Sequence, residues 1–395
     1  MDPLTVEWLN LALRWTHVIT GIAWIGSSFY FMWLDAHLVR ADPPHPTVEG
    51  HIWLVHSGGF YITEKRKLAA GQVPPDLHWF KWEAFYTLVT GLLLLGVVYY
   101  AAAGTFMVDS SKANFLPWQA IAIGVATLVV GWLVYDGLWM SPLARHQGWL
   151  TAFCCLLLAG VVWGLGQVFS GRAAYMHTGA LMGVIMAVNV WMRILPAQAA
   201  MIAATQTGTP VDWSLGEKAK HRSVHNNYMT LPVVFVMLSS HYPSTYGHPH
   251  GWAILIGLFA VGAIVRHWFN LRARGRDNPL LIPAAIFGGA LLATYAGLGG
   301  RDVGSGGPPV AFAEVRKVID TRCVACHSAR PTNPAFDAAP KNIKLDTPAE
   351  IRAQALPIKA QAVVSRVMPL GNLTEMTDAE RDLLGRWVNQ GAKVE

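Results

Sequence analysis

Charged residues are scarce in this chain and unevenly distributed. Only 14% of the 395 residues are charged, whereas soluble globular proteins carry about 25%. Residues 1–300 hold 17 Lys or Arg and 13 Asp or Glu, and residues 301–395 hold 13 and 11. A single soluble enzyme and a disordered chain are therefore both excluded for the first part, which is too apolar for either. We expect a membrane domain over 1–300 and a water-soluble domain over 301–395.

Cysteine is also rare, and its placement excludes a disulfide framework. Of the four cysteines, Cys154 and Cys155 are adjacent within an apolar stretch, and Cys323 and Cys326 belong to one short motif. Neither pair has the pattern of a disulfide-stapled secreted domain. The net charge of +6 does not indicate nucleic-acid binding, because most basic residues of the first 300 lie in short loops between apolar stretches.

Long apolar stretches are what the first 300 residues do contain. A helix needs roughly 20 apolar residues to cross a bilayer core of about 30 Å. Eight stretches are candidates, of which the sixth is short and contains Pro232. They cover residues 8–34, 82–103, 117–140, 147–169, 174–195, 226–241, 251–271 and 280–299.

Basic residues separate the loops into two classes. The loops after the first, third, fifth and seventh stretches carry twelve Lys or Arg, including Lys218, Lys220 and Arg222, and the other loops carry two. Such an excess is typical of cytoplasmic loops. With eight spans, the N-terminus and residues 301–395 then lie on the periplasmic side of a bacterial inner membrane. The Gly- and Pro-rich stretch 297–309 is interpreted as a linker.

A Cys-x-x-Cys-His motif occupies Cys323–His327. This spacing is typical of c-type haem attachment, in which two thiols add to the vinyl groups and the adjacent histidine reaches the iron. A zinc site needs a second pair of ligands, and 301–395 contains no other Cys or His. A redox dithiol needs a strand–helix context, whereas a helix is predicted just before the motif. We expect one covalent haem c, held by Cys323, Cys326 and His327.

The second axial ligand of such a haem is expected to be a methionine. Helices are predicted over Val310–Arg322 and Thr377–Lys393, and the second opens with a capping-box spacing to Glu380. Met368 lies several residues before this terminal helix, whereas Met376 abuts its first residue. We predict Met368 as the ligand and Met376 as an apolar wall residue. The predicted fold is all-α: a polytopic eight-helix membrane bundle followed by a class I cytochrome c domain.

Ionisable side chains within apolar stretches indicate function by default, because a bilayer disfavours them. Asp35, Arg193 and His241 lie near the ends of their stretches, where long polar side chains reach the interface. The remaining members are Arg14, His17, Glu83, Asp136, His225, Arg266 and His267. A b-type haem on one of these histidines is a less favoured second cofactor.

The chain as a whole resembles the bacterial membrane-bound urate oxidases, in which an eight-helix membrane domain is fused to a cytochrome c. The stretches that carry the resemblance are Trp15–Trp33, Ser223–Pro232, His241–Pro243, Arg266–Asn270, Cys323–His327 and Met368–Thr377. The resemblance implies oxidation of urate to 5-hydroxyisourate. Electrons would pass to haem c and on to the respiratory chain, through a soluble or membrane cytochrome c or a terminal oxidase.

A planar urate anion is suited to an arginine, stacking rings, a histidine base and asparagine amides. Proximity to haem c on the outer side favours the first helix. There we expect Arg14 as anion clamp, His17 as proton acceptor, sharing one helix face with it, and Trp24 as stacking partner.

A second group of candidates, His225, Asn226 and Asn227, lies in the most specific part of the resemblance. The sixth helix is expected to start near them at the inner face. The two groups would therefore flank one small ligand only if this helix were bent, as Pro232 permits.

Two other functions stay open from the residues alone. One is a quinol-to-cytochrome-c electron-transfer protein, which would need a quinone pocket and paired haem-ligating histidines. The other is a transporter or sensor tethered to a cytochrome. The resemblance favours urate oxidation over both.

Overall fold

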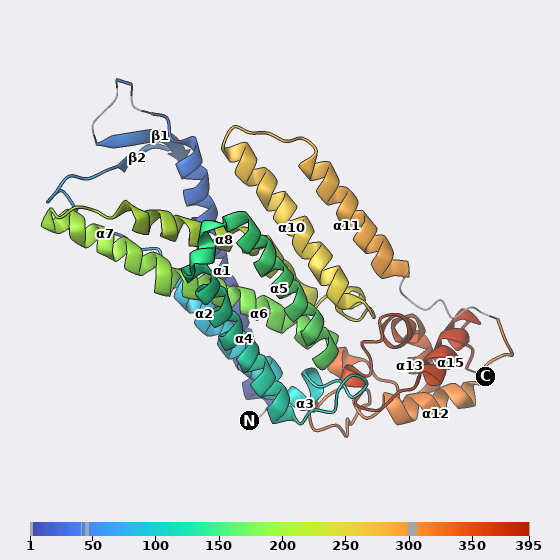
Figure 1. Ribbon diagram of the computed structural model, residues 1–395. Coiled ribbons are helices and arrows are strands. Elements are labelled where there is room, and N and C mark those ends of the chain that lie inside the picture. The colour runs from blue at the N-terminus through green and yellow to red at the C-terminus, as the bar shows by residue number, and fades with distance from the viewer. Residues whose placement is uncertain (1–2, 41, 44–46, 299–305, 395) are drawn as a thin grey trace.

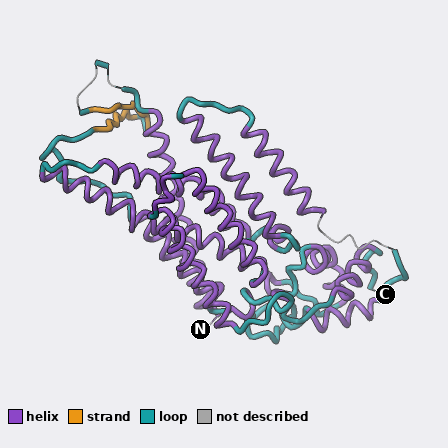
Figure 2. The backbone as a smooth tube through the Cα atoms, viewed as in Figure 1, coloured by secondary structure: helices purple, strands orange, loops and turns teal. Residues whose placement is uncertain are grey.

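The computed structural model of the chain describes residues 3–40, 42–43, 47–298 and 306–394. Long helices form a bundle, and a smaller group of short helices from the C-terminal part lies at one end of it (Figure 1). A β-hairpin lies at the opposite end of the bundle, and the rest is helix and loop (Figure 2). The prediction of a mostly helical chain is confirmed.

The long helices of the bundle are α1 (Pro3–His37), α2 (Trp82–Leu95), α4 (Pro117–Met140), α5 (Gln147–Val168), α6 (Gly171–Asn189), α8 (Trp213–Ser239), α10 (Gly251–Ala273) and α11 (Leu281–Leu298). A π-helical turn, Gly96–Tyr100, extends α2, and another, Val190–Ile194, joins α6 to α7 (Leu195–Thr207). The short helices α3 (Ala103–Phe106) and α9 (Pro243–Tyr246) lie in loops at the end that faces the C-terminal part (Figure 1).

Five helices among the described residues are long and apolar enough to cross a membrane. They are Trp82–Tyr100, Pro117–Met140, Gln147–Val168, Gly171–Thr207 and Gly251–Ala273. Helices α1, α8 and α11 cover the other three predicted stretches, but α1 and α8 are more polar and α11 is shorter. These helices indicate a membrane protein, and the count of eight spans stays a prediction.

Two helices extend well beyond the stretches predicted for them. Helix α8 begins at Trp213, where Asp212 caps it by accepting a hydrogen bond from the backbone nitrogen of Ser214. The prediction that this helix starts near residue 226 is therefore wrong, because its first three turns are polar and carry no apolar signal. The continuous helix 171–207 has 37 residues, or about 55 Å, which exceeds the thickness of a bilayer core.

A β-hairpin lies between α1 and α2, in a segment predicted only as a loop rich in basic residues. Strands β1 (Val48–His56) and β2 (Gly59–Arg66) pair antiparallel. Ser57 and Gly58 connect them, both with positive φ (50° and 75°), as the tightest hairpin turns require.

Helix α6 is the central helix of the bundle and packs against α2, α4, α5 and α8. More than half of its residues are buried, including polar ones such as His177 and Asn189. The contact with α8 is close: a Cβ on Gly179 would lie 2.4 Å from Cγ1 of Val236. Only glycine lets the two backbones approach this far.

The C-terminal part has a hydrophobic core of its own. Its helices are α12 (Phe312–Arg322), α13 (Pro348–Ala353), α14 (Ala355–Ile358) and α15 (Asp378–Asn389). Val315, Ile319, Ile351, Leu384 and Trp387 are almost fully buried in this core. The predicted capping box of the last helix is present, with Thr377 and Glu380 bonded reciprocally. Residues 299–305 of the predicted linker lie outside the described residues.

Candidate functional site

The Cys-x-x-Cys-His motif follows α12 directly, and its histidine has a defined orientation. Nδ1 of His327 lies 3.0 Å from the carbonyl oxygen of Ile343. Because a carbonyl only accepts, Nδ1 carries the proton and Nε2 is left with a free lone pair, the usual state of a metal-binding histidine. Burial raises the pKa of the Cys323 thiol to about 12, and that of Cys326 is also raised. The free Nε2 of His327, beside two cysteines that form no disulfide, fits a covalently attached haem.

Met368 packs against the same hydrophobic core as Cys323, while Met376 is 3% exposed and belongs to the core itself. A buried cation on α15 holds the Met368 loop. Arg381 donates from Nη1 to the carbonyl oxygen of Met368 (2.7 Å) and from Nη2 to Oδ1 of Asn372 (3.1 Å). Burial lowers the pKa of Arg381 to about 10. Arg381 thus fixes the backbone of Met368, which suits Met368 as an axial ligand.

Arg381 is a residue that sequence reasoning missed. It lies three positions before Leu384 and seven before Val388, so it belongs to the stripe of α15 that faces the core. The sequence signal that could have revealed Arg381 is a cation on an otherwise apolar stripe of the helix. Among the described residues, no group of three or more His, Cys, Asp or Glu is arranged to hold a metal ion.

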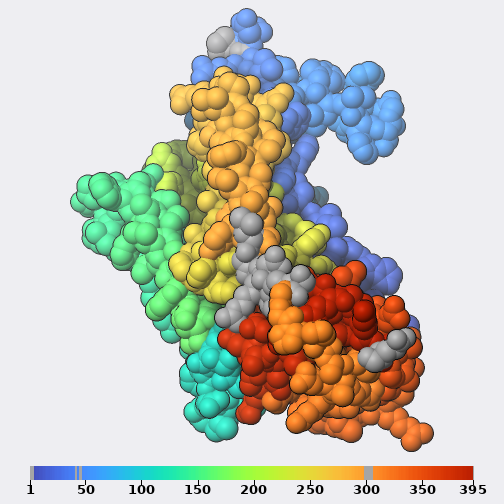
Figure 3. All heavy atoms as spheres, turned by 90° about the vertical axis from the view of Figure 1, so that its right-hand side faces the viewer, coloured from blue at the N-terminus to red at the C-terminus, as the bar shows by residue number. Residues whose placement is uncertain are grey.

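The loop that carries Met368 is also the part of the C-terminal domain that contacts the bundle. Ser110, in the loop after α3, donates from its backbone nitrogen to the carbonyl oxygen of Gly371 and from its hydroxyl to that of Asn372, both at 3.1 Å. On the other side, Gly247 at the end of α9 lies against Ser365 and Val367. Figure 3 shows the C-terminal part seated on this end of the bundle. The predicted haem ligand thus lies between two points of attachment.

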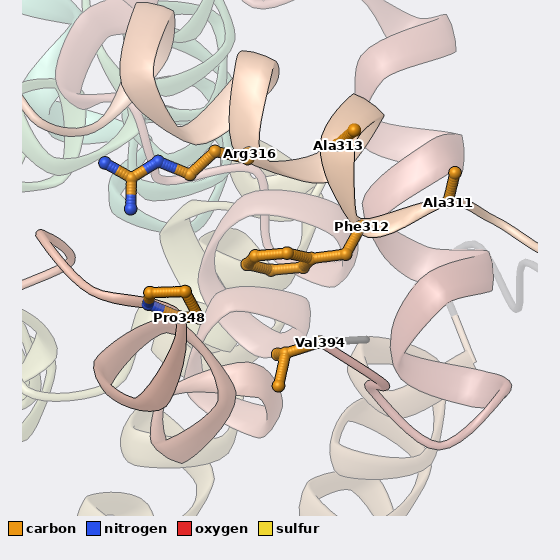
Figure 4. A pocket seen from close by; sticks show the side chains of 6 residues that line it. All are labelled: Ala311, Phe312, Ala313, Arg316, Pro348 and Val394. Atoms are coloured by element: carbon orange, nitrogen blue, oxygen red, sulfur yellow. The ribbon is translucent and has the colours of Figure 1, made fainter.

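A shallow surface depression of about 580 Å³ lies elsewhere on the C-terminal part (Figure 4). It is lined by Ala311, Phe312, Ala313, Arg316, Pro348 and Val394. None of the predicted haem-binding residues lines it, so it is separate from the predicted haem site.

The predicted residues of α1 lie along the first two-thirds of that helix. Arg14 is exposed and donates from Nε to Oδ1 of Asn10, 2.6 Å away on the same helix. Nδ1 of His17 lies 3.0 Å from Oγ1 of Thr90 on α2. Trp24 packs against a buried cluster formed by α5, α6, α8, α9 and α10.

The second predicted group lies in the middle of α8, not at its start. His225 Nδ1 is 2.8 Å from the Tyr135 hydroxyl of α4, and its ring lies 4.2 Å from that of Trp139. Asn226 donates to the carbonyl oxygen of Met186 and accepts from Asn189, at 2.9 and 3.0 Å. These amides join α8 to α6 within the bundle core.

One turn from His225, an ion-pair cluster contains two arginines and one carboxylate. Asp136 of α4 is 6% exposed and pairs with both Arg193 and Arg222. Its two oxygens therefore already bond to cations on both sides. The count of Lys218, Lys220 and Arg222 as loop charges is wrong, because all three lie within α8; Arg222 is also 5% exposed. Arg193, whose side chain is 33% exposed, pairs with the same carboxylate.

A further polar cluster lies on the side of α8 that faces α1 and α10. Oδ1 of Asn227 accepts from Nε of Arg266 (2.8 Å) and from Nδ2 of Asn270 (2.9 Å). The Arg266 guanidinium lies 3.9 Å from the ring centroid of Phe29 on α1. Nδ2 of Asn227 points at the sulfur of Met32.

The structure separates the two predicted groups of substrate residues. Met32 of α1 contacts Asn227, and His17 lies 15 positions earlier on the same helix, which is about 22 Å along its axis. One small ligand cannot contact both His17 and Asn227. This separation agrees with the expectation that the two groups do not flank one small ligand, although α8 is longer than predicted.

The match to a known protein family covers the helices of the bundle. The sequence model described as "Urate oxidase N-terminal" matches residues 3–296. The chain belongs to this urate oxidase family. Membership indicates a urate-related oxidoreductase that acts on a small molecule. The C-terminal part lies outside the match, and no curated protein or solved structure matches the chain.

Proposed function

We propose that the protein oxidises urate to 5-hydroxyisourate and passes the electrons to a haem c in residues 301–395. The observation that carries this proposal is the family match over the whole bundle, 3–296. The reaction adds one water to urate and releases two protons and two electrons. When bound, haem c accepts these electrons one at a time.

The C-terminal part would hold this group with four residues. Cys323 and Cys326 would attach it covalently, and His327 and Met368 would be its axial ligands. Support comes from the bond of His327 Nδ1 to the Ile343 carbonyl, which leaves Nε2 free. The contact of the Met368 loop with the bundle further supports electron transfer within one chain, since it holds the two parts together.

The remaining parts of the proposal concern location and partners. We place an eight-span bundle in a bacterial inner membrane, with the N-terminus and the cytochrome domain in the periplasm. The electron acceptor would be a soluble or membrane cytochrome c or a terminal oxidase. The apolar helices support the membrane location, and the excess of basic residues in alternate loops supports the orientation.

Anaerobic titration of the purified holoprotein with urate tests the function. The reduced-cytochrome c absorption bands should rise, and one urate should reduce two haems because each oxidation releases two electrons. Dithionite defines full reduction. If urate leaves the haem oxidised while dithionite reduces it, the proposal is wrong. Reduction by a quinol and not by urate would instead support the quinol-to-cytochrome-c alternative.

A further inference from the structure

Arg266 is a buried cation with no carboxylate partner among the described residues. It is 7% exposed, whereas the other strongly buried arginine of the bundle, Arg222, pairs with Asp136. The neutral Asn227 side chain bonds to Nε of Arg266. Nη2 of Arg266 contacts the sulfur of Met32, at 3.8 Å, and a thioether sulfur is a weak acceptor. Among the described residues, this guanidinium therefore contacts one amide oxygen and one weak sulfur acceptor, and no carboxylate.

A charge in this position is expensive unless an anion compensates it. Removing a guanidinium from water without a counter-charge costs several kcal/mol, and membrane-spanning segments retain such groups mainly for function. The bond to Asn227 orients Arg266 but leaves its positive charge unneutralised. An anionic ligand at Arg266 would supply the missing charge.

The neighbours of Arg266 define the shape of that ligand. The Phe29 ring lies 3.9 Å from the guanidinium carbon, so a flat molecule bonded in the plane of Arg266 would extend along an aromatic surface. The amides of Asn227 and Asn270 lie beside the guanidinium and provide both donors and acceptors. These groups match a planar anion with alternating N–H and C=O edges, which is the chemistry of an oxidised purine.

We propose that Arg266, Asn227 and Asn270 bind the urate anion, with Phe29 beside its ring. This inference rests on the proposed function and places the substrate between α1, α8 and α10. Among the six residues expected to contact substrate, it retains Asn227 and replaces Arg14 by Arg266 as the anion clamp. Arg14 is exposed and bonded within its own helix, so no neighbouring helix encloses a ligand beside it.

The site lies within the bundle, away from the C-terminal part. Arg266 is 15 positions from Gly251 at the start of α10, about 22 Å along the helix. Packed side chains fill part of this interval: one hydrophobic cluster contains Tyr175 and Tyr246, with Trp24 and Val367 packed against it. Val367 precedes the predicted haem ligand, so this cluster extends from the bundle to the Met368 loop.

Binding of urate to the dithionite-reduced holoprotein tests the site without turnover, because the reduced haem accepts no electrons. Arg266→Gln should raise the urate Kd about 10- to 150-fold, the loss expected for a charge-assisted hydrogen bond. Asn227→Asp is the sharper variant. It keeps the shape of the side chain and places a carboxylate 2.8 Å from Arg266 Nε, so it should abolish urate binding while the protein folds normally. Arg272→Gln, an exposed arginine on the same helix, is the matched control and should leave the Kd unchanged.

The outcomes separate the site from the function. Wild-type Kd and urate-dependent haem reduction in both Arg266→Gln and Asn227→Asp would overturn the site while urate oxidation stands. Loss of binding in Arg14→Gln with normal binding in Asn227→Asp would move the anion clamp to α1. If the wild-type protein neither binds urate nor is reduced by it, the proposed function fails and the site proposal fails with it.

Discussion

The contact between the bundle and the Met368 loop can be broken from the bundle side by one methyl group. Gly247 ends α9, and a Cβ there would lie 2.3 Å from the Ser365 carbonyl oxygen and 2.4 Å from Cγ2 of Val367. The backbone at Gly247 is right-handed helical, a conformation that alanine adopts readily; within α9 the added Cβ would lie 2.8 Å from the Pro243 carbonyl oxygen, a longer approach than the two across the interface. Gly247→Ala therefore acts mainly by pushing the C-terminal part off the bundle.

The size of the effect follows from overpacking. An extra methyl group in a closely packed contact costs about 1–3 kcal/mol. Applied to the contact, this cost raises the open fraction about 5- to 150-fold. The amide of Ser110, which donates to the Gly371 carbonyl across the interface, should exchange its hydrogen faster by the same factor.

Hydrogen exchange at Ser110 and stopped-flow reduction of the haem by urate are the two measurements. The exchange rate at Ser110 and the rate of haem reduction by urate should both change in Gly247→Ala. The reduction by dithionite should stay the same, because the haem site is intact. Gly306→Ala is the control, since a Cβ there meets no atom within 4 Å. Unchanged exchange at Ser110 in Gly247→Ala would refute the role of this contact.

Three further predictions concern the ends of the chain and its orientation. Met368→Ala should abolish the weak methionine–iron absorption band and lower the reduction potential, whereas Met376→Ala should leave the band intact; the reverse would exchange their roles. Thr377→Ala removes the cap of α15 and should destabilise the C-terminal domain by about 1 kcal/mol, measured by chemical denaturation. A reporter fused near Lys67 should be active only if it works in the cytoplasm, and one fused after Gly300 only if it works outside; opposite results at both positions would invert the topology.

Most helices could be predicted from the sequence because their boundaries are local. The runs at 117–140 and 147–169 coincide with α4 and α5 to within one residue, since apolar runs of this length are stable in a bilayer only as helices. The start of α8 could not be predicted in this way. Its first turns are polar, and their helical state depends on packing against α7 and on the Asp212 cap.

The site was only partly predictable. Asn227 could be named from its sequence context, and Arg266 was visible as an ionisable residue in an apolar stretch. Their hydrogen bond could not be foreseen, because it joins positions 39 apart on two helices. One of the two partners of Asp136 was hidden for the same reason: Arg222 is taken for a loop charge until α8 is seen to include it.

The sequence by itself determined where most apolar helices lie, where the Cys-x-x-Cys-His motif is placed and how the terminal helix is capped. Each of these depends on residues within one helix or one short motif, so spacing alone reveals it. Only the tertiary structure decided which buried cation lacks a carboxylate and which loop joins the two parts of the chain. The bond between Ser110 and Asn372 spans 262 positions, and such contacts depend on how whole helices pack, which no local pattern encodes.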